Sequence, residues 1–101
     1  DIQALLDASP AILTLQLRCL TVSTHPPQVE LVLPLTDAAR RQPGSDQFHG
    51  GPLMTLIDSA GDFAVALAVG GGVPTANLRV DFLRPASGEA IRAVATARRI
   101  G

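Results

Sequence analysis

The sequence predicts an α+β domain in which a long amphipathic helix lies against an antiparallel sheet. Apolar and polar residues alternate in segments near both ends of the chain, the period of half-buried strands. Between them, apolar residues recur every three or four positions, as on one face of a helix. Helices gathered on one face of an antiparallel sheet define this fold class. The 101 residues, 47 % of them hydrophobic and 17 % charged, suit one ordered domain, spanning residues 1–101.

The first half of the chain predicts a short helix followed by a β-hairpin. The helix covers Ile2 to Ala8 and ends at Ser9-Pro10. Four apolar residues from Leu13 to Cys19 alternate with polar ones, which indicates a strand. His25-Pro26-Pro27 breaks this strand, and a second alternating run follows from Val29 to Leu35.

The second half predicts the long helix and a second hairpin. The helix runs from Pro52 to Val69, because proline suits a first helical turn and three glycines follow at 70–72. Alternation from Thr75 to Phe82 predicts a third strand, and alternation from Ile91 to Ala97 predicts a fourth. A turn at Pro85 to Gly88 separates the two.

Composition excludes several classes of function. The net charge is −1, and tryptophan and tyrosine are absent, so we expect no nucleic-acid partner. All eight positive residues are arginine, which excludes a catalytic lysine. Cys19 has no partner for an internal disulfide, and two histidines with one cysteine make a poor zinc set. The chain opens without a signal-peptide pattern and has no apolar run of roughly 18 residues. We expect a cytoplasmic protein with no metal, cofactor or membrane partner.

The polar face of the long helix carries two carboxylates one turn apart. The apolar stripe centres on Leu53, Ala60 and Ala64, and Asp58 and Asp62 lie opposite it. An ordinary solvated face explains this pattern. If the pair is desolvated, one pKa rises toward the range of a general base.

His49-Gly50-Gly51 directly precedes the long helix. A helix N-terminus offers unpaired N–H groups, and two glycines let a ligand approach the backbone closely. Such a place can polarise a carbonyl and stabilise an oxyanion, with Asp58 two turns further on to activate water. The alternative is an ordinary loop that leads into a helix, with the histidine bracing the loop.

Together with Asp81-Phe82-Leu83-Arg84-Pro85, these residues resemble a known family. An H-G-G segment that opens the central helix, an acidic residue nine positions after its histidine and an F-L-R-P-like segment are similar to those of the phenylacetate-pathway (PaaI-type) hotdog-fold acyl-CoA thioesterases. The resemblance covers residues 44–101. It implies a hotdog fold, in which an antiparallel sheet wraps around a long central helix.

The resemblance also implies roles by position. Asp58 takes the place of the general base or nucleophile, and the Gly51 N–H holds the thioester carbonyl. Thr75, supplied by a partner subunit, orients water or substrate. His49 and Gly50 take substrate-binding positions in the same segment. Such sites lie between two subunits, which implies a homodimer or a dimer of dimers with acyl-CoA as substrate.

Arg98 and Arg99 end the fourth strand, where relatives often bind the CoA nucleotide, and arginine suits phosphate. Both are therefore candidate substrate contacts, although surface arginines are common. The sequence departs from the family at Pro43, where relatives often carry an asparagine that positions water or the carbonyl. Relatives also continue with two further strands after the point where these 101 residues stop, so we expect the domain to lack its last two strands.

The sequence favours two functions over a third, and the first is hydrolysis of an acyl-CoA thioester. The alternative is a non-catalytic hotdog module that binds acyl-CoA or serves assembly, which Pro43 favours and Asp58 opposes. A hotdog dehydratase is a third reading, but neither Asp58 nor Asp62 is followed by a histidine. The sequence does not name the acyl group and does not separate a general base from a nucleophile at Asp58.

Overall fold

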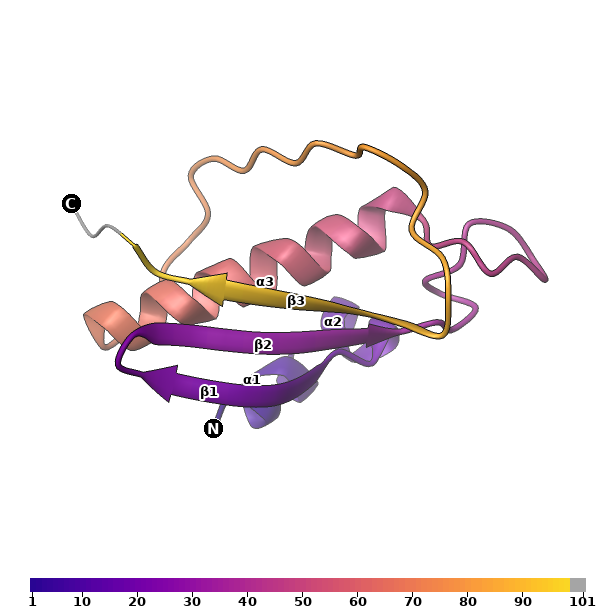
Figure 1. The fold of residues 1–101 in the computed structure, drawn as a ribbon. Coiled ribbons are helices and arrows are strands. Elements are labelled where there is room, and N and C mark those ends of the chain that lie inside the picture. Colours follow the sequence, from indigo (N-terminus) through magenta and orange to yellow (C-terminus); the bar gives the residue numbers. More distant parts are fainter. Residues whose placement is uncertain (99–101) are drawn as a thin grey trace.

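A computed structural model describes residues 1–98 and contains three helices and three strands within them. In chain order they are α1 (Ile2–Ala8), α2 (Pro10–Leu15), β1 (Arg18–Thr24), β2 (Pro27–Pro34), α3 (Gly50–Val69) and β3 (Ala90–Thr96). The long helix α3 lies along the three-stranded sheet, and α1 and α2 lie near β1 (Figure 1). The α+β class, with one long helix against an antiparallel sheet, is confirmed.

The sheet has the order β1-β2-β3, with both pairs antiparallel. The hairpin of β1 and β2 matches the first predicted hairpin, and its register shifts between Cys19 and Thr21, a bulge at Leu20. β2 and β3 pair without interruption from Gln28 with Thr96 to Pro34 with Ala90. β2 is therefore the central strand.

The core forms where β2 meets α3. Val29, Leu31 and Leu33 alternate along β2 and are completely buried, because period-two spacing turns all three to the same side. α3 meets them with the buried residues of its apolar stripe: Leu53, Leu56, Ala60 and Ala64. Half-buried alternate residues of β3 extend the same layer: Ile91, Ala93 and Ala95.

Helix α3 begins two residues earlier than predicted and ends where predicted. His49 is the N-cap residue, so both glycines that follow it lie in the first turn. Gly70 ends the helix in the left-handed conformation, with φ of 82°, which glycine adopts without steric cost. By length and hydropathy alone α3 could cross a membrane, but core helices meet the same criterion, and α3 packs on the sheet.

The predicted strand from Leu13 to Cys19 is wrong over residues 13–17, because β1 begins only at Arg18. Pro10 starts a second helix, because its missing N–H and fixed φ are tolerated in a first turn. Gln16, at φ of 60°, ends this helix in the left-handed region and turns the chain into β1. Leu15 and Leu17 are buried, whereas Leu13 is 53 % exposed, so the alternation did not mark one strand face.

The predicted strand from Thr75 to Phe82, and with it the second hairpin, is also wrong. Residues 73–86 run along α3 without joining the sheet (Figure 1). β1 and β3 occupy the two edges of β2, and strand 90–96 pairs with β2 instead of with residues 75–82. Without a neighbouring strand, an extended segment has no ladder of hydrogen bonds. The expectation that the domain lacks its last two strands concerns the chain after β3, which lies outside the described residues, and it stays a prediction.

The sheet-to-helix core predicts a strong contrast between two leucine substitutions. Leu31→Ala, in the core at 0 % exposure, should lower the free energy of unfolding by about 2–5 kcal/mol. Leu13→Ala, on the exposed face of α2, should change it by less than about 0.5 kcal/mol. Urea unfolding followed by circular dichroism measures both, and equal losses would contradict the assigned core.

Candidate functional site

The turn at His49-Gly50-Gly51 places two free backbone donors at the start of α3. The first four N–H groups of a helix have no partner within it, and Pro52 has none to offer. The N–H groups of Gly50 and Gly51 therefore remain available at the positive end of the helix dipole. Gly51 is exposed, and no atom lies within 4 Å of the place where a Cβ would stand. A carbonyl group can approach this backbone closely.

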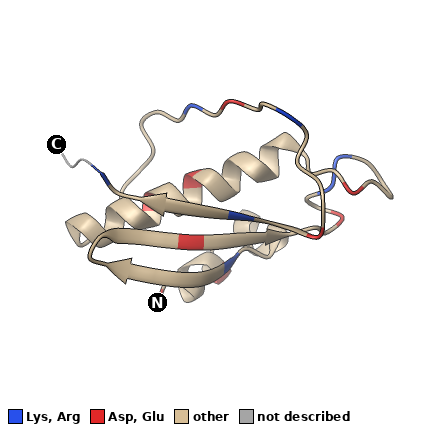
Figure 2. Ribbon diagram, in the orientation of Figure 1, with Lys and Arg blue, Asp and Glu red and all other residues tan. Residues whose placement is uncertain are grey.

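The side chains of Asp58, Asp62 and Thr75 meet in the structure. The Thr75 hydroxyl oxygen lies 2.5 Å from Asp58 Oδ1 and 3.0 and 3.1 Å from the two carboxylate oxygens of Asp62. The two aspartates are the only charged residues of α3, and the rest of the helix is tan in Figure 2. The contact lies within one chain, whereas the resemblance implied that a partner subunit supplies Thr75.

Burial raises the pKa of Asp62 above its ordinary value. The hydrogen bond from Thr75 acts in the opposite direction, and the nearby negative charge of Asp58 raises the pKa further. The environment of Asp62 therefore favours its neutral form more than water does.

Two hollows open beside the carboxylates. One, of about 310 Å³, lies between α2 and α3 and is bounded by Ile12 and Phe63. The other, of about 480 Å³, lies between α3 and residues 73–78. Asp58 and Asp62 line both. Apart from these two carboxylates the linings are uncharged, so a ligand here meets apolar walls and one acidic pair.

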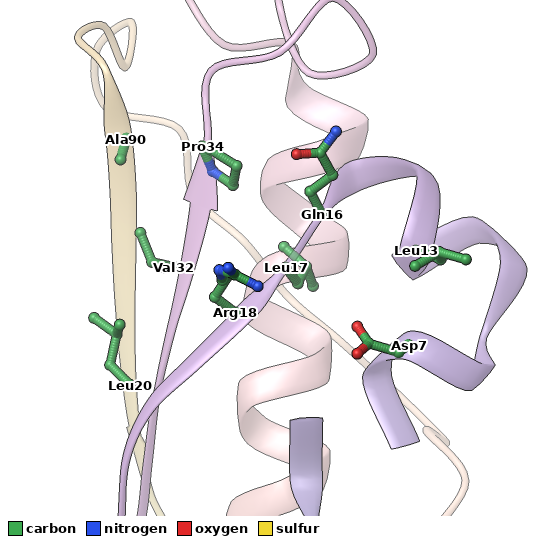
Figure 3. Close-up of a pocket in the computed structure, with 9 residues that line it drawn as sticks. All are labelled: Asp7, Leu13, Gln16, Leu17, Arg18, Leu20, Val32, Pro34 and Ala90. Carbon is green, nitrogen blue, oxygen red and sulfur yellow. The ribbon is translucent and has the colours of Figure 1, made fainter. Parts of the chain in front are cut away.

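A larger hollow, of about 520 Å³, lies on a different part of the molecule (Figure 3). Asp7 and Leu13 come from the two short helices, and Leu20 and Val32 come from β1 and β2. None of the motif residues lines it. Its volume is greater, but neither the N–H donors of Gly50 and Gly51 nor the carboxylates of α3 line it.

The remaining candidate residues are spread along the molecule. His49 is exposed and its N–H donates to the Ala39 carbonyl, 2.8 Å away. Gly50 lies under Phe82, whose ring would be 3.8 Å from a Cβ there. Arg98 follows the end of β3, which lies at the C-terminal end of α3 and away from the glycine turn (Figure 1). Arg99 lies outside the described residues.

Pro43 stands in an exposed loop beside Gly44, whose φ of 78° is left-handed. Its ring offers no side-chain donor at the place where the family often has asparagine. Within residues 1–98, no three histidine, cysteine or acidic side chains gather closely enough to hold a metal ion. The expected lack of a metal or cofactor stays a prediction.

Sequence reasoning missed two contacts at the site. From its spacing, Asp62 could lie on a solvated face or pair with Asp58, and neither expectation included the Thr75 hydroxyl that the two carboxylates share. The helical spacing of the two aspartates was a signal for this pairing, since residues four apart lie on one face. The contact of Phe82 with Gly50 had no sequence signal, because it depends on how residues 73–86 return along α3.

Comparison of the sequence with protein-family models identifies the family of the chain. The model described as "Thioesterase superfamily" matches residues 47–101, which is more than half of the chain and contains every motif residue discussed above except Pro43. The chain belongs to the thioesterase superfamily.

Similarity to particular proteins agrees with this assignment. A candidate esterase of Halobacterium salinarum is 46 % identical over 63 residues, which are 58 % of this chain and 41 % of that protein. The chain therefore spans less than half the length of this curated relative.

Solved structures share the fold. A protein from the thioesterase superfamily superposes with a TM-score of 0.76 at 32 % identity, over 90 % of this chain and 67 % of the other. A candidate thioesterase of Ralstonia eutropha JMP134, described as related to phenylacetic acid degradation, gives 0.76 at 27 % identity over 99 % and 79 %. A conserved Pseudomonas aeruginosa protein gives 0.78 at 21 % identity over 92 % and 73 %, and shows the fold alone. The fold is the hotdog type that the resemblance implied.

The raised pKa of Asp62 predicts how pH changes stability. Because folding favours its protonated form, Asp62 contributes stability below its unfolded pKa and loses it as pH rises through its folded pKa. Asp62→Asn should therefore be more stable than the wild type at pH 7, and the difference should shrink at pH 3. Urea unfolding at both pH values measures this, with the exposed Asp46→Asn as the matched control. A difference that is independent of pH would contradict the assignment.

Proposed function

We propose that this protein hydrolyses acyl-CoA thioesters. The observation that carries the proposal is the placement of Asp58. It stands nine residues after His49 in a chain of the thioesterase superfamily, midway along α3, and holds a hydrogen bond from Thr75 beside two apolar hollows. A carboxylate in this position serves a reaction at a carbonyl carbon.

In this mechanism the Gly51 N–H donates a hydrogen bond to the thioester carbonyl oxygen. The helix dipole and this donor stabilise the negative charge that develops on the oxygen as the carbonyl is attacked. Asp58 takes a proton from the attacking water, the carbon–sulfur bond breaks, and the thiolate of CoA receives the proton as it leaves. Alternatively, Asp58 attacks the carbonyl itself, and water then hydrolyses the anhydride.

The spacing of Gly51 and Asp58 supports a site shared by two copies of the chain. Asp58 follows Gly51 by seven positions, which is about 10 Å along a helix with a rise of 1.5 Å per residue. Seven positions are close to two full turns, so the two residues lie on nearly the same face of α3. Within one chain, a substrate carbonyl bound at Gly51 and a water bound at Asp58 would have to lie in a line along the axis of α3 to span that distance. Two copies with antiparallel α3 helices bring the glycine turn of one beside the Asp58 of the other.

The phosphate groups of the CoA portion would bind cationic side chains that lie away from the carboxylates of α3. Arg98 and Arg99 suit this role, because guanidinium groups bind phosphate through paired hydrogen bonds. His49 and Gly50 would contact the substrate near the carbonyl. The proposed reaction uses water, a carboxylate and backbone donors, so it requires no metal or redox cofactor, and a cytoplasmic location would place the enzyme beside its substrate.

Pro43 favours one alternative, a module that binds acyl-CoA without hydrolysing it. Proline cannot supply the hydrogen bond that an asparagine gives to water or to the carbonyl. Binding without turnover would leave Asp58 with no chemical task.

The thioesterase proposal predicts a large effect of one amide substitution. Asp58→Asn keeps the size of the side chain and removes the base, so kcat should fall by about 100- to 10,000-fold. Release of free thiol from short, medium, long and aryl acyl-CoA measures turnover. Asp46→Asn is the control and should retain full activity, because it lies in the exposed loop before the site. Equal background release from wild type and Asp58→Asn, with binding of acyl-CoA retained, would support the binding module.

The shared site predicts complementation between two inactive variants. Gly51→Pro removes the N–H donor, and Asp58→Asn removes the base. When the two proteins are mixed as subunits, half of the dimers contain one intact site of two, so about a quarter of wild-type activity should return. Each variant alone should remain inactive. If no activity returns although analytical mass measurement shows mixed dimers, both groups act within a single chain.

A further inference from the structure

The Thr75 hydroxyl lies within hydrogen-bond distance of two carboxylates but can donate a hydrogen bond to only one of them. The hydroxyl carries one proton and can donate it to one acceptor only. The 2.5 Å distance to Asp58 Oδ1 identifies Asp58 as that acceptor. Asp62 still lies 3.0 and 3.1 Å from the same oxygen. If both carboxylates were ionised, Asp62 would face the lone pairs of the hydroxyl with no hydrogen between them.

One further proton satisfies all three groups. When Asp62 is neutral, its O–H donates to Thr75 Oγ1, and the Thr75 proton is directed to the Asp58 carboxylate. The chain of donors then runs from Asp62 through Thr75 to Asp58. A single negative charge remains, on the carboxylate that the proposed reaction uses.

Within residues 1–98, no cation beside the pair removes the need for this proton. The elements around the pair are α2, α3 and residues 72–78, and the residues that they contribute to the two hollows include no ionisable group besides Asp58 and Asp62. Arg79, the positive residue nearest to Thr75 along the chain, forms an ion pair with Asp81 at 3.5 Å. Two carboxylates close together without a cation favour the state with one proton on the pair, because ionising both costs repulsion energy. The raised pKa of Asp62 agrees with this account.

We infer that Asp62 is a positioning residue for Asp58: it keeps a proton, donates it to Thr75, and thereby fixes the Thr75 proton on the Asp58 carboxylate. This inference rests on the proposed thioesterase function for its consequence in turnover. The form that acts carries one proton on the pair. At low pH the pair takes up a second proton, and the base is lost. Ionisation of Asp62 at higher pH releases the Thr75 proton and places a second negative charge beside the developing oxyanion. The pH dependence of kcat/KM is therefore bell-shaped.

A titration of the free protein tests the shared proton without any substrate. Carboxyl ¹³C signals of labelled aspartate, followed by NMR from pH 3 to pH 8, should show that the signals of Asp58 and Asp62 respond to the same two steps of the pair. Thr75→Val should change both signals, and Thr75→Ser, which keeps the hydroxyl, should preserve the coupling. In Asp58→Asn the Asp62 step should move to lower pH, because the neighbouring charge is gone. Independent titration of the two aspartates, unchanged by Asp58→Asn, would overturn the inference.

The pH profile of turnover tests the positioning role. Asp62→Asn keeps a donor to Thr75 that does not ionise, so kcat/KM at the wild-type optimum should fall by no more than about threefold and the decline at higher pH should vanish. Asp62→Leu matches its size but donates nothing, and should lose at least about tenfold across the whole range. Equal losses in both variants, with the bell shape retained in Asp62→Asn, would overturn the inference. If the wild type hydrolyses no thioester while the NMR steps are coupled, the proposed function fails and the shared proton stands.

Discussion

The packing of α3 against β2 is the contact on which the other features depend. Leu53, Leu56, Ala60 and Ala64 bury one face of the helix on the completely buried side of the central strand. Burial of this stripe fixes the rotation of the helix about its axis, because a turn of one residue, about 100°, would expose it. The helix begins after the N-cap residue His49 and ends at Gly70 in the left-handed conformation. The glycine turn and the two carboxylates therefore stand at set places on a rigid element.

Helix α3 carries, at two different places, the two kinds of group that a reaction at a carbonyl carbon needs. The N-terminus of α3 supplies donors that stabilise negative charge, and its middle supplies a carboxylate that handles a proton. Neither group depends on the conformation of a long side chain. Residues 73–86 complete the arrangement from the other side, since Thr75 reaches the carboxylates and Phe82 covers Gly50. The returning segment thus touches both parts of the site, although it is not part of the sheet.

Most elements of the fold could be predicted from the sequence, and the two errors have physical causes. The long helix, the strand at 27–34 and the strand at 90–96 were predicted because their apolar residues keep one period throughout. The run from Leu13 to Cys19 misled because four alternating residues also fit a helical turn followed by a bend, and Pro10 favoured the helix. Residues 75–82 have the alternation of a strand, but a strand exists only beside another strand, and β3 takes the place next to β2.

The sequence by itself determined the fold class, the membership in a family suggested by His49-Gly50-Gly51 and Asp58, and the presence of two acidic residues on one helix face. These are local properties, set by residue spacing along the chain. Only the tertiary structure decided that Thr75 of the same chain meets Asp58 and Asp62, and that burial raises the pKa of Asp62. Contacts between residues 13 or more positions apart depend on the path of the loop after Gly70, and the electrostatics of a carboxylate depend on what surrounds it in space.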